Sequence, residues 1–343
     1  MALNQNTNMP DTGKSPIING NTVTFIYRGN AETVYVAGEY NQWELEDRMS
    51  KNEEGVWYIN KRFPENARFD YKLIVDGNWI TDPLNEKTTC VSADNINSNL
   101  IMPKYSSDHE KIVNSQVPKG NLLKNVKLKS DYMGCSMNYH VYLPHGYENS
   151  HISHVLYVMD GSEYLNYANI DRVLDYMIHM GEIPRMVAVL TDPNDRNAEY
   201  TISRKHYSYF IKELVPFAER NYLSPRVMVE RSIIGVSWGG LTALYIAANT
   251  PGKFNRLLSQ SGSFWPKDWL IFDIISKADV SNMKFCLQTG TVQDTEEMND
   301  ALAKLIESKH GHVEYAKYSE SHNWMNWKGH LNEGLKTLYS GIN

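Results

Sequence analysis

The residues around one serine form a pattern that is typical of a catalytic nucleophile. The segment Gly235-Val-Ser-Trp-Gly239 has the G-x-S-x-G form, in which a strand turns abruptly into a helix and exposes the hydroxyl group of Ser237. Side chains two positions to either side of this serine would collide with neighbouring backbone, so glycines are needed there. The apolar pair Ile233-Ile234 precedes the segment and the small-residue run Ala243–Ala248 follows it. We therefore predict a nucleophilic serine rather than a structural glycine-rich turn.

A serine hydroxyl is a weak nucleophile and needs a base within hydrogen-bonding distance. On turns of this kind the partners follow along the chain in the order serine, acid, histidine. The histidines after the serine are His310, His312, His322 and His330. His310 and His312 flank a glycine at the end of a predicted helix, which solvated histidines explain well. His322 lies in the loop after the predicted strand Val313–Tyr318, where the base belongs, so we predict that it is the base.

Two interpretations of Asp294 stay open. It follows the predicted strand Phe285–Gly290, at the position where the acid of a Ser-His-Asp triad would lie. Asp294 and Glu297 also match a capping box, in which Asp294 would only cap the helix that begins there. Glu296 and Glu297 are poorer candidates for the acid, and a Ser–His dyad is a further possibility.

An oxyanion hole requires backbone N–H groups that point at the negative charge formed during the reaction. One donor should be Trp238, directly after the nucleophile. The other should come from the loop Asp160–Tyr164, which follows a predicted strand ending at Met159. Within this loop the N–H of Ser162 is the predicted donor.

The elements that must position these residues alternate between strand and helix in residues 121–343. Apolar strand runs at 154–159, 185–190, 231–235, 256–259 and 284–288 are separated by helical segments. This alternation predicts an α/β fold with a mostly parallel sheet covered by helices on both faces. We expect this part of the chain to be the catalytic domain.

The N-terminal part has a different rhythm. Residues 21–102 contain short alternating runs separated by turn signals such as Arg28-Gly-Asn30 and Asp76-Gly-Asn78, which predicts a small all-β, immunoglobulin-like sandwich. Residues 1–20 are polar and are expected to form a disordered tail. Residues 103–120 have the composition of a linker between the two domains.

Composition excludes several classes of protein. The 34 Lys+Arg and 40 Asp+Glu residues give a net charge of -6, which argues against a general nucleic-acid binder. No apolar run is long enough to span a membrane. The three cysteines are too far apart for a disulfide framework or a zinc site, and no His/Asp/Glu cluster suggests a protein-bound metal. No signal peptide is visible, so a cytoplasmic location is expected.

Longer segments resemble the enterochelin (ferric-siderophore) esterase family, which belongs to the esterase-D-like α/β-hydrolases. The matching segments are Gly235–Tyr245, Leu258–Trp265, Met159-Asp-Gly161, Glu213-Leu-Val-Pro216 and His322-Asn-Trp324. The resemblance implies an α/β-hydrolase fold and hydrolysis of a carboxylic ester through an acyl-enzyme. It implies no cofactor, because iron would arrive only as part of the substrate.

Three positions carry further implications of this resemblance. The family's acid typically stands three residues after a glycine, where this chain has Gln293, and Asp294 comes one residue later. Arg196 matches an arginine near the family's active site and could contact an anionic catecholate, or it could form an ordinary ion pair with Glu199. Trp324, two residues after the predicted base, is expected to contact the substrate.

The N-terminal segment resembles the family's own early-set leading domain and the glycogen-binding modules. The matching residues lie in Gly38–Trp43, Tyr71-Lys72 and Val75–Trp79. In carbohydrate-binding members, the residues that match Trp43, Lys72 and Trp79 contact the sugar, because aromatic faces pack against C–H groups and lysine binds hydroxyls. The alternative is that Trp43 and Trp79 pack against the hydrolase domain or over its active site.

These observations lead to an expected function and two alternatives. The expected function is a serine esterase that opens a ferric catecholate trilactone siderophore and releases its iron. The first alternative is an acetyl or feruloyl esterase that acts on carbohydrate esters. The second is a non-catalytic carbohydrate-binding protein with an inactive hydrolase fold.

Overall fold

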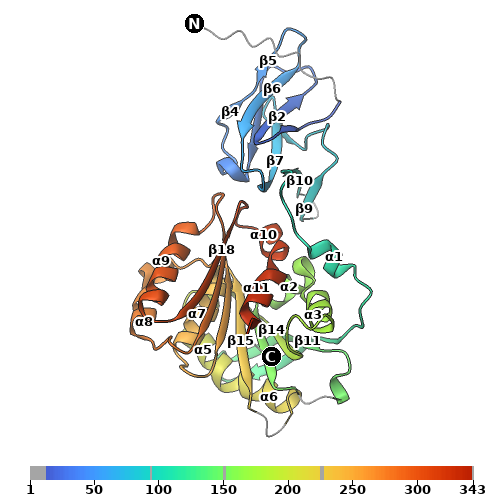
Figure 1. Ribbon diagram of the computed structural model, residues 1–343. Coiled ribbons are helices and arrows are strands. Elements are labelled where there is room, and N and C mark those ends of the chain that lie inside the picture. Colours follow the sequence, from blue (N-terminus) through green and yellow to red (C-terminus); the bar gives the residue numbers. More distant parts are fainter. Residues whose placement is uncertain (1–12, 93–94, 150–151, 225–227, 342–343) are drawn as a thin grey trace. The chain divides into compact units, whose positions relative to one another are not determined.

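The computed structural model describes residues 13–92, 95–149, 152–224 and 228–341 (Figure 1). The chain forms two compact units. One contains the residues up to Ser106 together with Ser319–Ser321, and the other contains Ser107–Tyr318 and His322 to the C-terminus. The first unit is an all-β sandwich and the second is an α/β domain, which confirms the predicted fold class.

The first unit consists of two packed sheets. One has the strand order β1-β2-β6-β5, and the other has the order β4-β3-β7-β10-β9, with β8 paired to β7. Alternate residues such as Phe25 on β2 and Phe69 and Tyr71 on β7 are fully buried between the sheets. The elements are β1 (Ile17–Asn19), β2 (Thr22–Tyr27), β3 (Val34–Gly38), η1 (Glu39–Asn41), β4 (Asp47–Arg48), β5 (Ser50–Lys51), β6 (Trp57–Arg62), β7 (Arg68–Val75), β8 (Asn78–Ile80), β9 (Thr88–Ser92) and β10 (Asn95–Ile101).

The structure revises the predicted domain boundaries at two places. Residues 1–12 of the predicted tail lie outside the described residues, but Ile17–Asn19 form β1, because a turn at Gly20 (φ 59°) lets them pair with Thr22–Thr24. The predicted linker contains the helix α1 (His109–Val113). Ile112 of α1 is buried in the core of the second unit, so this segment is part of that unit.

The second unit is built on a sheet with the order β11-β12-β14-β13-β15-β16-β17-β18. β11 and β12 pair antiparallel with their neighbours, and the strands from β14 to β18 are parallel to one another. The strands are β11 (Asn121–Ser130), β12 (Cys135–Leu143), β13 (His154–Met159), β14 (Met186–Asp192), β15 (Glu230–Val236), β16 (Arg256–Gln260), β17 (Lys284–Gly290) and β18 (His312–Tyr318).

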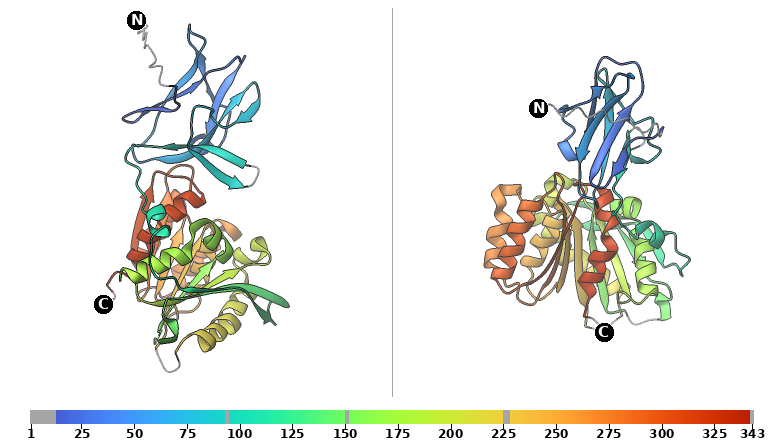
Figure 2. Two further views of the ribbon diagram at one scale, coloured as in Figure 1. Left: turned by 90° about the vertical axis from the view of Figure 1, so that its right-hand side faces the viewer. Right: turned by 45° about the horizontal axis from the view of Figure 1, so that its top comes forward.

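Helices cover both faces of this sheet, as Figure 2 shows in its right-hand view. Val155, Tyr157 and Met159 of β13 face one core, and Leu156 and Val158 face the other, because successive side chains of a strand point to opposite faces. The remaining elements are η2 (Tyr147–Asn149), α2 (Gly161–Ala168), α3 (Ile170–His179), α4 (Arg196–Tyr200), α5 (Arg204–Tyr209), η3 (Phe210–Leu214), α6 (Val215–Tyr222), α7 (Trp238–Ala248), α8 (Pro266–Lys277), α9 (Glu296–Ser308), α10 (Trp324–Gly329) and α11 (Leu331–Tyr339).

The parallel strands bring the predicted site residues to one edge of the sheet. β15 ends directly before Ser237, β17 ends shortly before Asp294, and β18 ends shortly before His322. Because these strands run in the same direction, their carboxyl ends meet at the same edge. In the described part of the chain, no helix is long and apolar enough to cross a membrane.

Candidate active site

Ser237 lies on the sharp turn that the sequence predicts. Its backbone has φ 53° and ψ -121°, a strained conformation for a residue other than glycine. Its N–H donates to the carbonyl of Gln260 over 2.9 Å, which ties the turn to β16. A Cβ atom on Gly235 would lie 2.3 Å from the carbonyl carbon of Gly239, so β15 and α7 can approach this closely only without a side chain there.

Ser237, His322 and Asp294 form a continuous hydrogen-bonded array. The Nε2 atom of His322 lies 3.1 Å from Ser237 Oγ, and its Nδ1 atom lies 2.7 Å from Asp294 Oδ1. Because a carboxylate can only accept, a neutral His322 carries its proton on Nδ1, donates it to Asp294 and accepts from the serine hydroxyl. This arrangement is that of a nucleophile, a general base and an orienting acid.

The carboxylate of Asp294 is fully buried and satisfied by several donors. Oδ2 accepts from the Ser261 hydroxyl and from the N–H of Gly290, each over 2.6 Å, and Oδ1 also accepts from the N–H of Thr295. Burial raises the pKa of Asp294, but the hydrogen bond from His322, the positive charge of His322 when it is protonated, and the Ser261 and Gly290 donors outweigh burial and hold this pKa below its usual value. Thr295 is the N-cap of α9, so the capping-box interpretation of Asp294 is wrong.

The position of His322 is supported from α10. Trp327 packs its ring edge-to-face with His322 at 5.1 Å, and its Nε1–H donates to Ser261 Oγ over 2.8 Å. Asn323, directly after the base, caps α10 by accepting from the N–H groups of Met325 and Asn326. The loop that contains His322 is therefore held by the Asn323 cap and by the indole of Trp327. The same indole binds Ser261, which in turn donates to Asp294.

Of the two N–H groups predicted for the oxyanion hole, that of Trp238 lies beside Ser237, whereas that of Ser162 is bound to another residue. Trp238 is the first residue of α7, so its N–H has no partner within the helix and lies next to the nucleophile. The N–H of Ser162 instead donates to Asp192 Oδ1 over 2.7 Å, and its hydroxyl donates to Asp192 Oδ2. Ser162 is therefore not placed as the second donor, because the carboxylate at the end of β14 already binds it.

Arg196 forms an ion pair with Asp160 rather than with Glu199. Its Nε and one terminal nitrogen each donate to a carboxylate oxygen of Asp160 over 2.9 Å. Glu199, the predicted ion-pair partner, is buried and binds His206 at 3.0 Å, so the predicted pair with Glu199 is wrong. The guanidinium also lies 5.7 Å from the ring centre of Trp238 and is about one-third exposed, so it is part of the wall beside the nucleophile.

Aromatic side chains flank the array on two sides. Trp238 packs against Trp265 at 5.5 Å, and half of the Trp265 side chain is exposed. Trp324, the first residue of α10, packs against Tyr164 at 5.1 Å and the exposed Tyr167 at 5.5 Å. Flat aromatic walls of this kind suit substrates with aromatic groups.

Residues outside the sequence predictions also contact the array. Ser261 and Ser263 follow β16, the strand between those that lead to Ser237 and Asp294. Their position at the carboxyl end of that strand was a signal that could have placed both near the nucleophile. Among the described residues, no group of three or more His, Cys, Asp or Glu side chains is placed to hold a metal ion.

Ser263 should position the nucleophile. Its hydroxyl lies 3.2 Å from Ser237 Oγ, its N–H donates to the carbonyl of Ser237, and it is buried. We expect Ser263→Ala to lower kcat about 5-fold and to leave KM nearly unchanged, because a neutral hydrogen bond contributes about 1 kcal/mol. Steady-state kinetics of the purified variant measure both constants.

The matched variant for this prediction is Ser263→Thr, which keeps the hydroxyl group and should recover most of kcat. An equal decrease of kcat in Ser263→Ala and Ser263→Thr would show that the packing of this side chain, rather than its hydroxyl group, affects catalysis. A rise in KM without a change in kcat would place Ser263 in ground-state binding instead.

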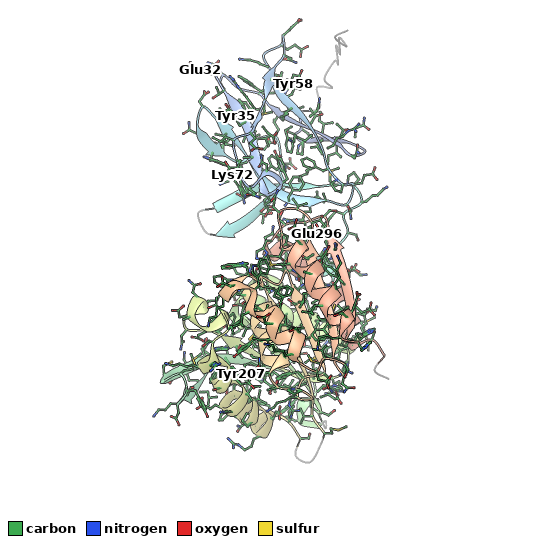
Figure 3. The ribbon with its side chains drawn as sticks, turned by 90° about the vertical axis from the view of Figure 1, so that its left-hand side faces the viewer. Glu32, Tyr35, Tyr58, Lys72, Tyr207 and Glu296 are labelled. Carbon is green, nitrogen blue, oxygen red and sulfur yellow. The ribbon has the colours of Figure 1, made fainter. Side chains whose placement is uncertain are left out.

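The three residues predicted to bind carbohydrate lie together on the first unit. In the pairing of β3, β7 and β8, Tyr35 and Trp79 both lie opposite Ile74, so they share a sheet face with Lys72. Tyr35 and Lys72 are labelled on this side of the sandwich in Figure 3. The rings of Trp43 and Trp79 are 6.2 Å apart, and nearly half of Trp79 is exposed. The face has the aromatic surface that a sugar ring requires.

Comparisons with known proteins agree with this division of the chain. The family described as "Putative esterase" matches residues 130–338, more than half of the chain. The family described as "Glycogen recognition site of AMP-activated protein kinase" matches residues 21–107. The two matches correspond to the α/β unit and to the β-sandwich, respectively, as the resemblances noted in the sequence imply.

Individual relatives are similar at low identity. The chain is 25% identical over 240 residues to the uncharacterized protein YjcH of Bacillus subtilis (strain 168), covering 64% of this chain and 99% of that protein. It is 24% identical over 205 residues to the iron(III) enterobactin esterase of Escherichia coli (strain K12), covering 54% of this chain and about half (49%) of that enzyme. The enterobactin esterase FES from Shigella flexneri, solved in the presence of enterobactin, shares the fold with a TM-score of 0.76 at 21% identity over 94% of each chain. The chain therefore belongs to the esterase family and is a carboxylic ester hydrolase.

Proposed function

We propose that the protein is a serine esterase that hydrolyses the ester bonds of a ferric catecholate trilactone siderophore of the enterobactin type and so releases iron. The observation that carries the proposal is the Ser237–His322–Asp294 array in a chain similar to enterobactin esterases. In this proposal iron enters only as part of the substrate, the protein needs no cofactor of its own, and the reaction takes place in the cytoplasm.

In the proposed reaction, each residue of the array has one role. Ser237 Oγ attacks the ester carbonyl carbon while His322 Nε2 takes the serine proton, and the Trp238 N–H stabilises the resulting oxyanion. The carbon–oxygen bond to the alcohol then breaks, and His322 returns its proton to the departing alkoxide, which leaves an acyl group on Ser237. Water attacks this acyl-enzyme with His322 again as base, and the acid and free serine are released. Asp294 keeps His322 in the required tautomer throughout.

The surroundings of the nucleophile suit catecholate groups. The exposed Trp265 beside Trp238, and Tyr167 beside Trp324, provide aromatic faces on two sides of the array. Arg196 adds a partly exposed guanidinium, although Asp160 neutralises much of its charge. A substrate that carries several aromatic rings would use these walls, whereas a simple acetyl ester would not.

Product analysis tests the proposal most directly. Purified protein is offered ferric enterobactin, the iron-free form and a feruloylated oligosaccharide, and the products are identified by mass spectrometry. Linear dihydroxybenzoylserine products from either siderophore support the proposal. If neither siderophore is cleaved, the proposal is overturned. Release of ferulate together with that result would support the alternative of an esterase for carbohydrate esters.

A second candidate function, carbohydrate binding by the first unit, is favoured by the face that contains Trp43, Lys72 and Trp79. We expect Trp79→Ala to weaken binding to soluble glucan at least 5-fold, because an aromatic packing contact contributes about 1 kcal/mol. Affinity electrophoresis of the full chain in glucan gels measures the effect.

The matched control is Trp269→Phe, which alters a similarly exposed tryptophan on the α/β unit and should leave glucan binding unchanged. If the unmodified protein migrates equally in gels with and without glucan or xylan, the face does not bind carbohydrate. If Trp79→Ala retains esterase activity, ester hydrolysis does not depend on carbohydrate binding by the first unit.

A further inference from the structure

A pocket outside the Ser237–His322–Asp294 array has no assigned role. It lies between α5, α7 and α8, has a volume of about 890 Å³, and contains no residue of the array in its described lining. Tyr207, which lines it, is labelled in Figure 3. The volume is in the range of sites that bind an organic molecule and is far larger than one inorganic ion requires.

The pocket is positively charged in a protein whose net charge is -6. Arg204, Lys205 and Lys267 line it, and its described lining contains no aspartate or glutamate. None of the ion pairs among the described residues involves these three side chains, although the ammonium group of Lys267 donates to the carbonyl of Ile202 over 2.9 Å. Three cations that line one pocket and form no ion pair among the described residues repel one another, and a bound anion would reduce that repulsion.

The rest of the lining is suited to an apolar body. Leu270 and Ile274 of α8, together with Ile202, form an aliphatic wall. The rings of Tyr207 and Tyr245 lie 5.7 Å apart at 58° and form an aromatic wall. The Tyr207 hydroxyl is bound to the carbonyl of Asn249 over 2.9 Å, which fixes that ring in place. A purely inorganic anion would leave these walls unused.

We propose that this pocket is a second binding site, which takes an organic anion with an aromatic or aliphatic body. The carboxylate or phenolate of the ligand would lie among Arg204, Lys205 and Lys267, and its body would pack on the aliphatic and aromatic walls. Such a ligand can come from two sources: it can be a free small carboxylate, or it can be a remote anionic part of the ester substrate.

Isothermal titration of the full-length Ser237→Ala variant with 2-naphthoate tests the site without turnover. We expect one naphthoate per chain, weaker binding at higher salt, and little binding of the neutral 2-naphthylmethanol. Adding Arg204→Ala and Lys205→Ala should weaken naphthoate binding at least 10-fold. Both side chains are exposed, so their removal should leave the fold intact.

The matched control is Lys127→Ala with Lys129→Ala, which removes two exposed positive charges from β11, outside the pocket, and should leave the affinity unchanged. Adding Ile274→Glu to the Ser237→Ala background, which places a carboxylate in the aliphatic wall, should also prevent binding. The proposal is overturned if naphthoate does not bind or if naphthylmethanol binds equally well. It is also overturned if the Arg204→Ala/Lys205→Ala and Lys127→Ala/Lys129→Ala variants bind naphthoate with the same affinity.

A competition titration distinguishes the two sources of the ligand. If ferric enterobactin displaces naphthoate from Ser237→Ala, a part of that substrate occupies the pocket. If both bind together, the pocket takes a separate small anion. If naphthoate binds but the siderophore does not bind at all, the pocket stands as a site and the proposed siderophore substrate fails.

Discussion

Replacing Ser237 by alanine should reduce kcat for ester hydrolysis by about a million-fold, and any remaining hydrolysis should come from binding and the oxyanion donor alone. Ser237 Oγ is the hydroxyl 3.1 Å from His322 Nε2, and no covalent intermediate can form without it. Burst and steady-state kinetics with an activated aryl ester measure the loss. The same variant distinguishes an esterase from a non-catalytic carbohydrate-binding protein, whose function would not change.

Two further variants make this result decisive. Ser308→Ala removes an exposed hydroxyl at the end of α9 and should retain full activity. The double variant Ser237→Ala/His322→Ala should have the same kcat as Ser237→Ala. The two residues act as one unit, so once the serine is removed the histidine has no proton to accept. A folded Ser237→Ala protein with activity within 10-fold of the original would exclude Ser237 as the nucleophile.

Asp294→Asn should lower kcat about 10⁴-fold and leave the fold intact. The carboxylate of Asp294 accepts from His322 Nδ1 over 2.7 Å. An amide in its place can present an N–H group to Nδ1, which favours the tautomer that cannot take the serine proton at Nε2. The kcat of the purified variant is measured with the same aryl ester, and circular dichroism verifies folding.

Glu297→Gln is the control for Asp294→Asn. Glu297 is an exposed carboxylate in the first turn of α9, so the neutral variant removes a nearby negative charge without touching the array. We expect its kcat to be unchanged. A well-folded Asp294→Asn protein with near-normal turnover would remove Asp294 from the array and leave a Ser–His dyad.

The local parts of the site could be predicted because their signals lie within a few residues of one another. The turn at Ser237 depends on the approach of Gly235 to Gly239, four positions away, and on the flanking strand and helix. Strand periodicity was sufficient to predict the fold class and to place His322 at the end of β18. Patterns of this range are visible in a sequence without its contacts.

The remaining assignments depended on residues far apart in the chain. Whether Asp294 orients a base or caps a helix depended on a contact with His322, 28 positions later. Ser162 binds Asp192, 30 positions away, and Arg196 binds Asp160, 36 positions away, so neither partner could be chosen from local spacing.

The sequence by itself was sufficient to predict Ser237 as the nucleophile and His322 as the base, and it determined the two domain types and the overall negative charge. Only the tertiary structure decided the acid, the support from Ser263, the neutralisation of Arg196 and the concentration of three cations between α5, α7 and α8. The physical reason is the range of the interactions. Helix, strand and turn patterns depend on nearest neighbours, whereas hydrogen bonds and charges act between whichever side chains the fold brings within a few ångströms.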